Sequence, residues 1–278
     1  MKFSPRGSSA IMHRPPTSRQ GSPFRRLLPT RAKKQAEIHR QDVLLLLIRQ
    51  TELRFLSLRN FGGLDEKALV GKQIRIIDLL KRIRNKHWHN QLYDILKFRF
   101  HRRGYVRSEK EQQRLNDLLL HELNLVANGP GRNFETEELH ALFQATYFLS
   151  VGNYPAALRH YRGLLRRFEE NQSQQRIAPA HYRQALQGIL DTLLAAGLYG
   201  EIPYFTAKLN GDRPGLPGPD LNDSALVYLY NSLALLHSGR LDEAAALRER
   251  FEEPLFRKVH LLGPAMQLRL FLHASVLW

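Results

Sequence analysis

The amino-acid sequence predicts an all-α protein made of antiparallel helical hairpins that stack as an α-solenoid. The first observation is the stretch 139–171, where apolar residues recur at helical spacing on both sides of Gly152. Gly152 suits the left-handed residue that ends one helix, and Pro155 suits the first turn of the next. The second observation is that similar corners return at Gly197 and Gly239, 45 and 42 residues further along. Since one hairpin cannot bury its own apolar face, neighbouring hairpins must share it.

Length and composition exclude several other classes of protein. The 278 residues are 43% hydrophobic, enough for a substantial core, and include no cysteine. Disulfides, thiol catalysis and thiolate zinc sites are therefore excluded. The aliphatic run 43–48 is far shorter than the roughly 20 residues of a membrane span, and no secretory signal is visible. We expect a cytoplasmic protein with no membrane span. A compact all-α bundle is the alternative fold.

Composition also divides the chain into three parts. Residues 1–32 carry Arg, Ser and Pro with no acid, which predicts a disordered basic arm. A transit peptide has the same Arg-rich, Ser-rich and acid-poor composition, but the prolines disrupt the amphipathic helix that it needs. A true start codon further downstream is a third alternative. Residues 33–130 form a basic helical-hairpin region, and 131–278 form helical repeats. Because a solenoid normally ends in a polar capping helix, the apolar end at Trp278 favours a chain that is truncated relative to a longer parent, although Trp278 could also pack back onto the array.

Hydrophobic periodicity and helix breakers predict the individual helices. Ser108 and Glu111 have the spacing of a capping box, and Asn128–Gly131 reads as a joint. Gly and Pro residues make 210–220 a loop. The expected helices span 33–60, 65–86, 88–100, 108–127, the two arms of 139–171, 179–196, 201–209, 222–237, 241–253 and 255–278.

The net charge of +16 lies entirely in the first half of the chain. Up to Pro130 there are 27 Lys and Arg against 11 Asp and Glu, whereas the remaining residues carry 15 of each. Such asymmetry favours an acidic partner: nucleic acid, an acidic protein or an anionic surface. A solvated basic face with a disordered arm is the alternative.

The three corners share a pattern: a glycine, a large apolar residue two positions later and, in two of them, alanine after three more. The residues are Gly152, Tyr154 and Ala157; Gly239, Leu241 and Ala244; and Gly197 and Tyr199, with Ile202 in place of alanine. These corners resemble those of tetratricopeptide repeats, and the chain resembles uncharacterised bacterial proteins of that kind. The spacing is longer than the family's repeat of about 34 residues.

The resemblance implies a right-handed solenoid that serves as a non-catalytic scaffold for a protein or peptide partner. It also implies a groove lined by the first helices of successive hairpins. Carried onto this chain, the groove positions are Thr146, Ser150, Gln184, Gln187, Asp191 and His237.

No sequence motif indicates catalysis, a metal or a cofactor. Gly63 to Lys72 has the wrong glycine spacing for a phosphate-binding loop, and no HExxH pair occurs among the histidines. We therefore predict that the chain is not an enzyme and takes no cofactor or metal. An active site assembled from scattered residues is the alternative.

The basic half also predicts an anion-binding or nucleic-acid-binding surface, which is the second functional hypothesis. Its cations are Lys72, Arg75, Arg82, Lys86, Arg102 and Arg103. Trp88 and Tyr105 are available to stack on bases. A solvated helix face is the simpler explanation of the same charges.

Overall fold

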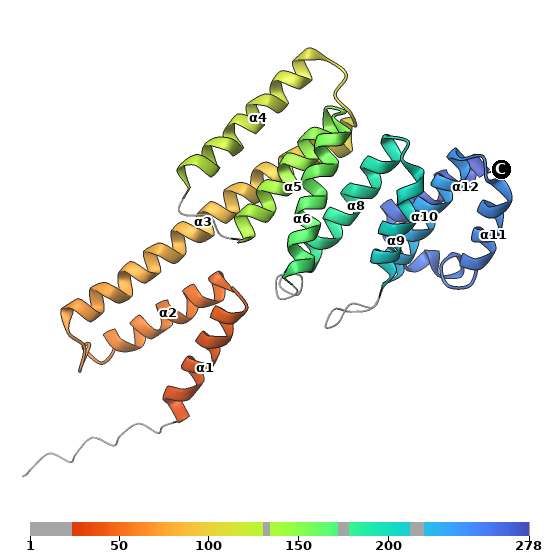
Figure 1. Cartoon of the computed structure of the whole chain (residues 1–278). Coiled ribbons are helices and arrows are strands. Elements are labelled where there is room, and N and C mark those ends of the chain that lie inside the picture. The colour runs from red at the N-terminus through yellow and green to blue at the C-terminus, as the bar shows by residue number, and fades with distance from the viewer. Residues whose placement is uncertain (1–23, 130–133, 172–177, 212–219, 278) are drawn as a thin grey trace, which may run out of the picture. The chain divides into compact units, whose positions relative to one another are not determined.

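A computed structural model describes residues 24–129, 134–171, 178–211 and 220–277. Within these residues every regular element is a helix and no strand occurs, which confirms the predicted all-α class (Figure 1). From α5 to α11, each helix packs against the next one in the chain. None of the described helices combines the length and hydrophobicity that a membrane span requires. The α-helices are α1 (Phe24–Ile38), α2 (Asp42–Ser57), α3 (Glu66–Arg103), α4 (Glu109–Asn128), α5 (Phe134–Ser150), α6 (Tyr154–Glu170), α8 (Pro179–Ala195), α9 (Ile202–Asn210), α10 (Leu221–His237), α11 (Leu241–Phe251) and α12 (Pro264–Leu277), with 3₁₀ turns η1 (Tyr199–Glu201) and η2 (Phe256–Leu261).

The chain divides into two compact units, residues 1–72 and 73–278, with the boundary inside α3. In the first unit, the single helix predicted over 33–60 is wrong, because the chain turns between α1 and α2. Arg40 takes a left-handed φ of 51°, and the Gln41 N–H donates to the Ala36 carbonyl at 2.8 Å. This is a Schellman helix end. Arginine occupies the position where glycine is usual, so no helix-breaking residue in the sequence marks this turn.

The separate helices predicted over 65–86 and 88–100 are also wrong, because α3 runs through both. No Gly or Pro lies between them, and Tyr93 and Leu96 are buried at helical spacing. The predicted helix 255–278 is instead η2 followed by α12, with Gly263 between them. The Ser108 cap of α4 is confirmed, since its hydroxyl accepts the Glu111 N–H at 3.3 Å.

The predicted corner between α5 and α6 is confirmed in detail. Gly152 has a φ of 76°, and the Asn153 N–H donates to the Phe148 carbonyl at 2.8 Å. The Asn153 side chain then caps α6 by accepting the Ala156 N–H at 3.2 Å. The corners at Gly197 and Gly239 repeat this backbone, with φ of 72° and 73° and the same closing hydrogen bond at 2.9 Å in each.

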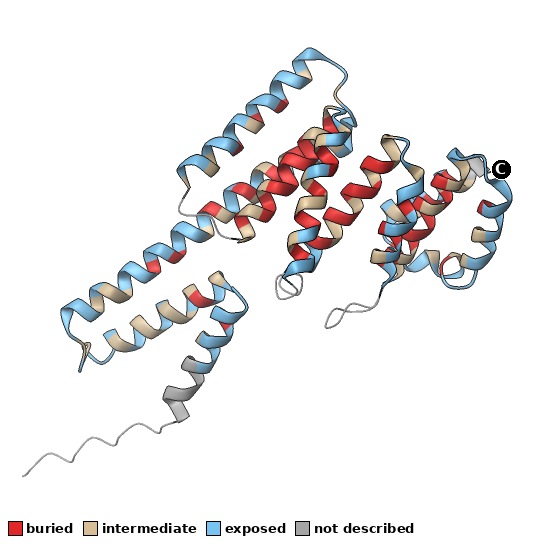
Figure 2. Cartoon of the chain, viewed as in Figure 1, coloured by how far each residue is buried: buried red, intermediate tan, exposed pale blue. Residues whose placement is uncertain are grey.

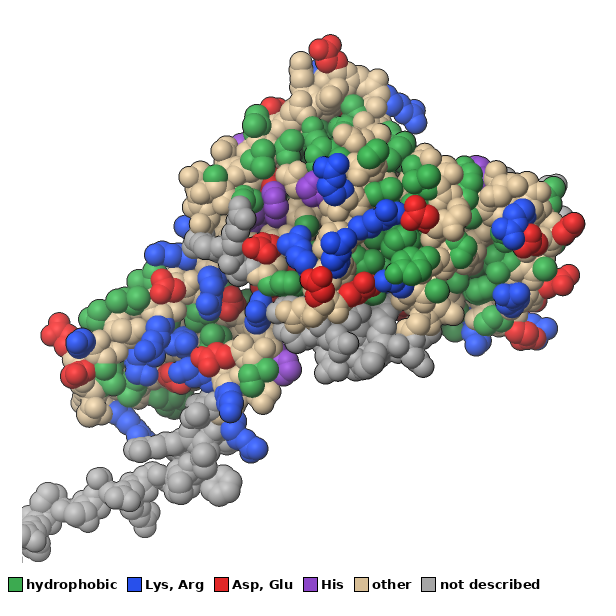
Figure 3. Space-filling view, in the orientation of Figure 1, with side chains coloured by type: hydrophobic (Ala, Val, Ile, Leu, Met, Phe, Trp, Pro, Cys, Tyr) green, Lys and Arg blue, Asp and Glu red, His purple; other side chains and the backbone are tan. Residues whose placement is uncertain are grey.

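Buried residues of the second unit concentrate in α5, α6, α8 and α10 (Figure 2). The closest approach is between Gly188 of α8 and Tyr161 of α6, where a Cβ on Gly188 would lie 2.2 Å from the tyrosine Cζ. Only glycine allows this contact. On the face in view, Lys and Arg side chains are interspersed with apolar ones over α6 and α8 (Figure 3).

Several predictions fall on residues outside those described. These are the first part of the predicted arm, residues 1–23; the second half of the predicted joint at 128–131; the centre of the loop at 210–220; and Trp278. Residues 24–32, which the composition assigned to the arm, belong instead to α1.

Candidate functional site

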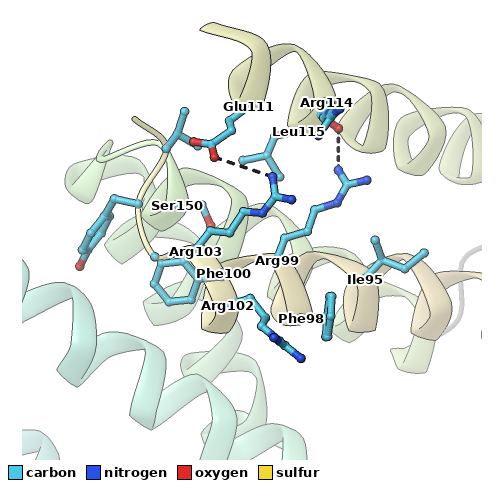
Figure 4. A pocket seen from close by; sticks show the side chains of 13 residues that line it. Ile95, Phe98, Arg99, Phe100, Arg102, Arg103, Glu111, Arg114, Leu115 and Ser150 are labelled. Carbon is cyan, nitrogen blue, oxygen red and sulfur yellow. Dashed lines mark hydrogen bonds and ion pairs between the residues drawn. The ribbon is translucent and has the colours of Figure 1, made fainter. Parts of the chain in front are cut away.

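Four arginines line a pocket of about 430 Å³ at the place where α3 ends and α4 begins; Arg99 and Arg103 extend toward α4, whereas Arg102 extends from the other side of α3 (Figure 4). Arg99, Arg102 and Arg103 come from the last turns of α3, and Arg114 comes from α4. Glu111 is the single acid in the lining. We call this the arginine pocket, and its excess of positive charge suits a ligand that carries anionic groups.

Hydrogen bonds hold the walls of the arginine pocket together. Arg99 Nη1 donates to the Arg114 carbonyl at 2.8 Å and so ties α3 to α4. Arg103 lies 3.7 Å from the Glu111 carboxylate. The connecting loop is fixed to α5, because the Val106 N–H donates to the Ser150 carbonyl at 2.9 Å. The pocket is therefore a product of three helices and not of one basic run.

The floor of the arginine pocket is apolar and partly aromatic. Arg102 lies over the Phe98 ring, 5.5 Å from its centroid, and that ring is 62% exposed. Phe100 packs edge-on against Tyr105 at 5.7 Å between centroids. Ile95 and Leu115 complete the floor. A ligand with anionic groups beside aliphatic or aromatic ones would match both parts of this surface.

The structure brings together only part of the predicted basic site. Arg102, Arg103 and Tyr105 all line the arginine pocket. Lys86 is instead ion-paired with Glu135 at 2.9 Å. In the first unit, Lys72 lies 3.9 Å from Glu52.

The other predicted basic and stacking residues are on the surface of α3. Arg75 and Arg82 are exposed side chains of this helix, outside the arginine pocket. Trp88 is 42% exposed, with the Arg84 guanidinium 5.0 Å from its ring. This pair is a cation–π contact that leaves one aromatic surface accessible.

The first two predicted groove residues are buried inside the second unit. The Thr146 hydroxyl lies 2.9 Å from the Tyr161 hydroxyl, and Ser150 donates to the Thr146 carbonyl at 2.7 Å. Burial also raises the pKa of Tyr93 to about 12, an effect that its hydrogen bond with Thr146 only partly offsets. These side chains link α3, α5 and α6.

The remaining groove residues do not form one surface patch. Asp191 accepts a hydrogen bond from the Tyr230 hydroxyl at 2.5 Å, and burial raises the pKa of this carboxyl. His237 is exposed and stacks on Tyr199 at 5.3 Å. Gln184 and Gln187 are half-buried on α8, and Gln184 Oε1 is buried with no hydrogen-bond partner among the described atoms.

A buried carboxylate fixes the other end of α4. Glu122 lies 2.8 Å from His140 Nδ1 of α5 and 3.3 Å from His89 Nδ1 of α3. Burial alone would raise the pKa of Glu122, but the hydrogen bonds and charge of the two histidines outweigh it, so the pKa lies below its usual value. Among the described residues no group of three or more His, Asp or Glu is arranged to hold a metal ion.

Sequence reasoning missed Arg99, Arg114 and Phe98. Arg99 is four residues before Arg103 and therefore lies on the same face of a helix, a signal that was available. Arg114 is on a different helix, and only the return of α4 along α3 reveals it.

No protein-family model, curated protein or solved structure matches this chain.

Proposed function

We propose that this chain is a non-catalytic helical-repeat scaffold that binds an acidic protein segment in the arginine pocket. The observation that carries the proposal is the set of four arginines, Arg99, Arg102, Arg103 and Arg114, that line one pocket together with apolar side chains. Guanidinium groups form strong, directional hydrogen bonds with carboxylates, and the floor would accept aliphatic or aromatic neighbours of those carboxylates. The proposal places recognition outside the groove implied by the family resemblance.

The proposed architecture is a right-handed, tetratricopeptide-like solenoid with a disordered basic arm, in a cytoplasmic protein. Its support is the repeated corner geometry at Gly152, Gly197 and Gly239. Helix pairs joined in this way stack with their neighbours and leave continuous surfaces for partners.

Charge reversal in the arginine pocket tests the proposed function. The double variant Arg102→Glu/Arg103→Glu removes two exposed cations and keeps Arg99, which ties α3 to α4. Lys258→Glu, an exposed residue of η2, is the matched control. In affinity capture from the native cell, we expect the full chain and the control to retain an acidic protein after nuclease treatment. The double variant should lose it.

If the double variant retains the same protein, the arginine pocket is not the site that recognises it. Loss of all captured material after nuclease treatment would instead support the second candidate function.

That second candidate is binding of single-stranded nucleic acid along α3. The specific observation in its favour is the exposed Trp88 with Arg84 beside it, a pairing of stacking surface and cation. Single-strand binding predicts a slope of about −0.7 per neutralised phosphate against log salt. The variant Trp88→Ala should weaken binding of an oligonucleotide without affecting an acidic peptide.

A further inference from the structure

A second basic hollow, of about 760 Å³, lies on the outer side of α6. Arg159, Arg162 and Arg166 line it, and its lining contains no acidic residue. Their spacing of three and four residues places them on one face of the helix. We call this the α6 hollow.

Gly163, in the middle of α6, lines the α6 hollow. A Cβ built on Gly163 meets no other atom within 4 Å, so the position opens onto unoccupied space. Glycine at the centre of a helix costs stability, and no close contact at Gly163 requires it. A side chain at position 163 would therefore project into the hollow and occupy part of it.

Two of the three arginines are available to a ligand. Arg162 is ion-paired with Glu201 at 2.5 Å and lies over the Phe205 ring. Arg159 and Arg166 are exposed on either side of Gly163. Between them the floor is aliphatic, including Leu158 and a 44% exposed Leu198. The remaining lining residues are Tyr154, Pro155 and Ala196.

The α6 hollow adjoins the arginine pocket through a pair of tyrosines. Tyr105 lines the arginine pocket, Tyr154 lines the α6 hollow, and their rings are 6.3 Å apart in an edge-to-face contact. The hydrogen bond from Val106 to Ser150 holds the two sides of this junction in place. A ligand leaving one hollow across the tyrosines would enter the other.

We propose that the arginine pocket and the α6 hollow form one track for a single extended acidic protein segment, which crosses Tyr105 and Tyr154. The inference rests on the proposed function and adds the length and course of the partner. Both floors offer aliphatic surface, which suits the side chains of a peptide. The two tyrosines contact each other, and that contact occupies part of the ring surface that bases would need for stacking.

Two peptides of glutamate, leucine and glycine in repeating order test the track on the full chain. One has about four residues and the other about ten, which extend to about 13 Å and about 33 Å. The longer peptide should bind about tenfold or more tightly, because it adds charge-assisted hydrogen bonds in the α6 hollow. Fluorescence anisotropy gives both affinities.

Obstructing the α6 hollow should reduce the advantage of the longer peptide. Gly163→Leu places a branched side chain in the hollow, whereas Gly163→Ala is the control that changes the same residue and obstructs less of it. Arg159→Glu/Arg166→Glu should act like Gly163→Leu. All three variants should bind the short peptide as the unmodified chain does, and circular dichroism confirms that each is folded.

The outcomes separate the inference from the proposed function. If Gly163→Leu and Arg159→Glu/Arg166→Glu leave the longer peptide bound as tightly as before, the track is wrong and the arginine pocket stands alone. If Arg102→Glu/Arg103→Glu changes neither peptide's affinity, the proposed function fails as well. If an oligo-deoxythymidine loses affinity in the variants of both hollows and neither peptide binds, the occupant is nucleic acid and the proposal of a protein segment is overturned.

Discussion

Two glycines in the middle of neighbouring helices have opposite reasons for being glycine. Gly188 of α8 meets the Tyr161 ring, which is almost fully buried and has no room to move aside. Gly163 of α6 meets nothing. The same glycine-to-alanine substitution should therefore destabilise the chain at Gly188, where packing requires glycine, and not at Gly163, where the position is open.

We expect Gly188→Ala to lower the free energy of unfolding by about 2 kcal/mol, because the new methyl group overpacks the contact with Tyr161. Gly163→Ala should raise it by about 1 kcal/mol through helix propensity alone. Urea denaturation followed by circular dichroism measures both. In the double variant Gly188→Ala/Tyr161→Leu, the cost of the alanine should largely disappear. An unchanged cost would show that the ring is not its cause.

The buried Tyr93 predicts a loss of stability at alkaline pH. Its pKa is about 12 in the folded chain, against about 10 when unfolded. The folded state therefore keeps a proton that the unfolded state releases, and stability falls as pH rises from about 10 to about 12.

Below about pH 10, the difference in unfolding free energy between the wild type and Tyr93→Phe should be constant. Above about pH 10, the unfolding free energy of the wild type should fall relative to that of Tyr93→Phe by about 1.4 kcal/mol per pH unit. Denaturant titrations at a series of pH values measure this, and parallel curves up to about pH 12 would contradict the assignment.

At the residue scale, the sequence predicts which side chains can bind an anion better than it predicts where those side chains lie in the fold. Arg102 and Arg103 were recognised as anion-binding candidates because they are adjacent cations at a helix end. Their partner Arg114 is on another helix, and no local pattern connects the two. Thr146 was expected in a groove, but its hydroxyl is satisfied by Tyr161 inside the core. Polarity alone did not indicate which surface a side chain faces.

At the scale of elements, the corners show how one backbone turn is built with different caps. Asn153, at the start of α6, has φ and ψ of −85° and 73°, and Arg240, at the start of α11, has −90° and 65°. Asn153 caps its helix with its side chain, whereas Arg240 makes no such hydrogen bond. Equivalent backbones should accept the same cap.

We expect Asn153→Ala to cost about 1 kcal/mol of unfolding free energy, since the Ala156 N–H loses its acceptor. Arg240→Asn should raise stability by supplying the missing cap to α11. Thermal unfolding monitors both, with Asn153→Asp as the control that keeps a capping oxygen. If Arg240→Asn is less stable than the wild type, the ion pair of Arg240 with Glu243 contributes more stability than a helix cap would.

The elements themselves were predictable where glycine marks a turn and not elsewhere. Gly152, Gly197 and Gly239 each take the left-handed conformation that the sequence predicted. Arg40 adopts the same conformation without a glycine, so the turn between α1 and α2 was missed. The reverse error concerns α3, where two helices, 65–86 and 88–100, are predicted and the structure has one. No Gly or Pro lies between them to disrupt the helix hydrogen bonds.

At the scale of the whole molecule, the two units differ greatly in buried apolar surface. Among the described side chains of the first unit, Ala36 and Leu45 are the only buried ones. The second unit contains both hydrophobic clusters, which extend from α3 to α12. Local opening should therefore be much easier in the first unit.

Hydrogen exchange on the full chain tests this difference. Amides of α1 and α2 should exchange by local opening, at least about a hundredfold faster than those of α5, α6 and α8, a factor that corresponds to about 2.7 kcal/mol. The amides of α5, α6 and α8 should exchange only through global unfolding. Their exchange should therefore be slower still in Gly163→Ala, which is expected to be more stable. Equal protection in both units would contradict the link between buried apolar surface and local stability.

The hydrogen bond from Val106 to Ser150 links two parts of the second unit, and this link has a consequence for binding. It joins the loop that borders the arginine pocket to the last turn of α5, directly before the Gly152 corner and α6. A segment anchored at one hollow would immobilise this junction, so the second contact would form on a surface already ordered. The loss of loop freedom is then shared between the two contacts, and each should strengthen the other by the same factor.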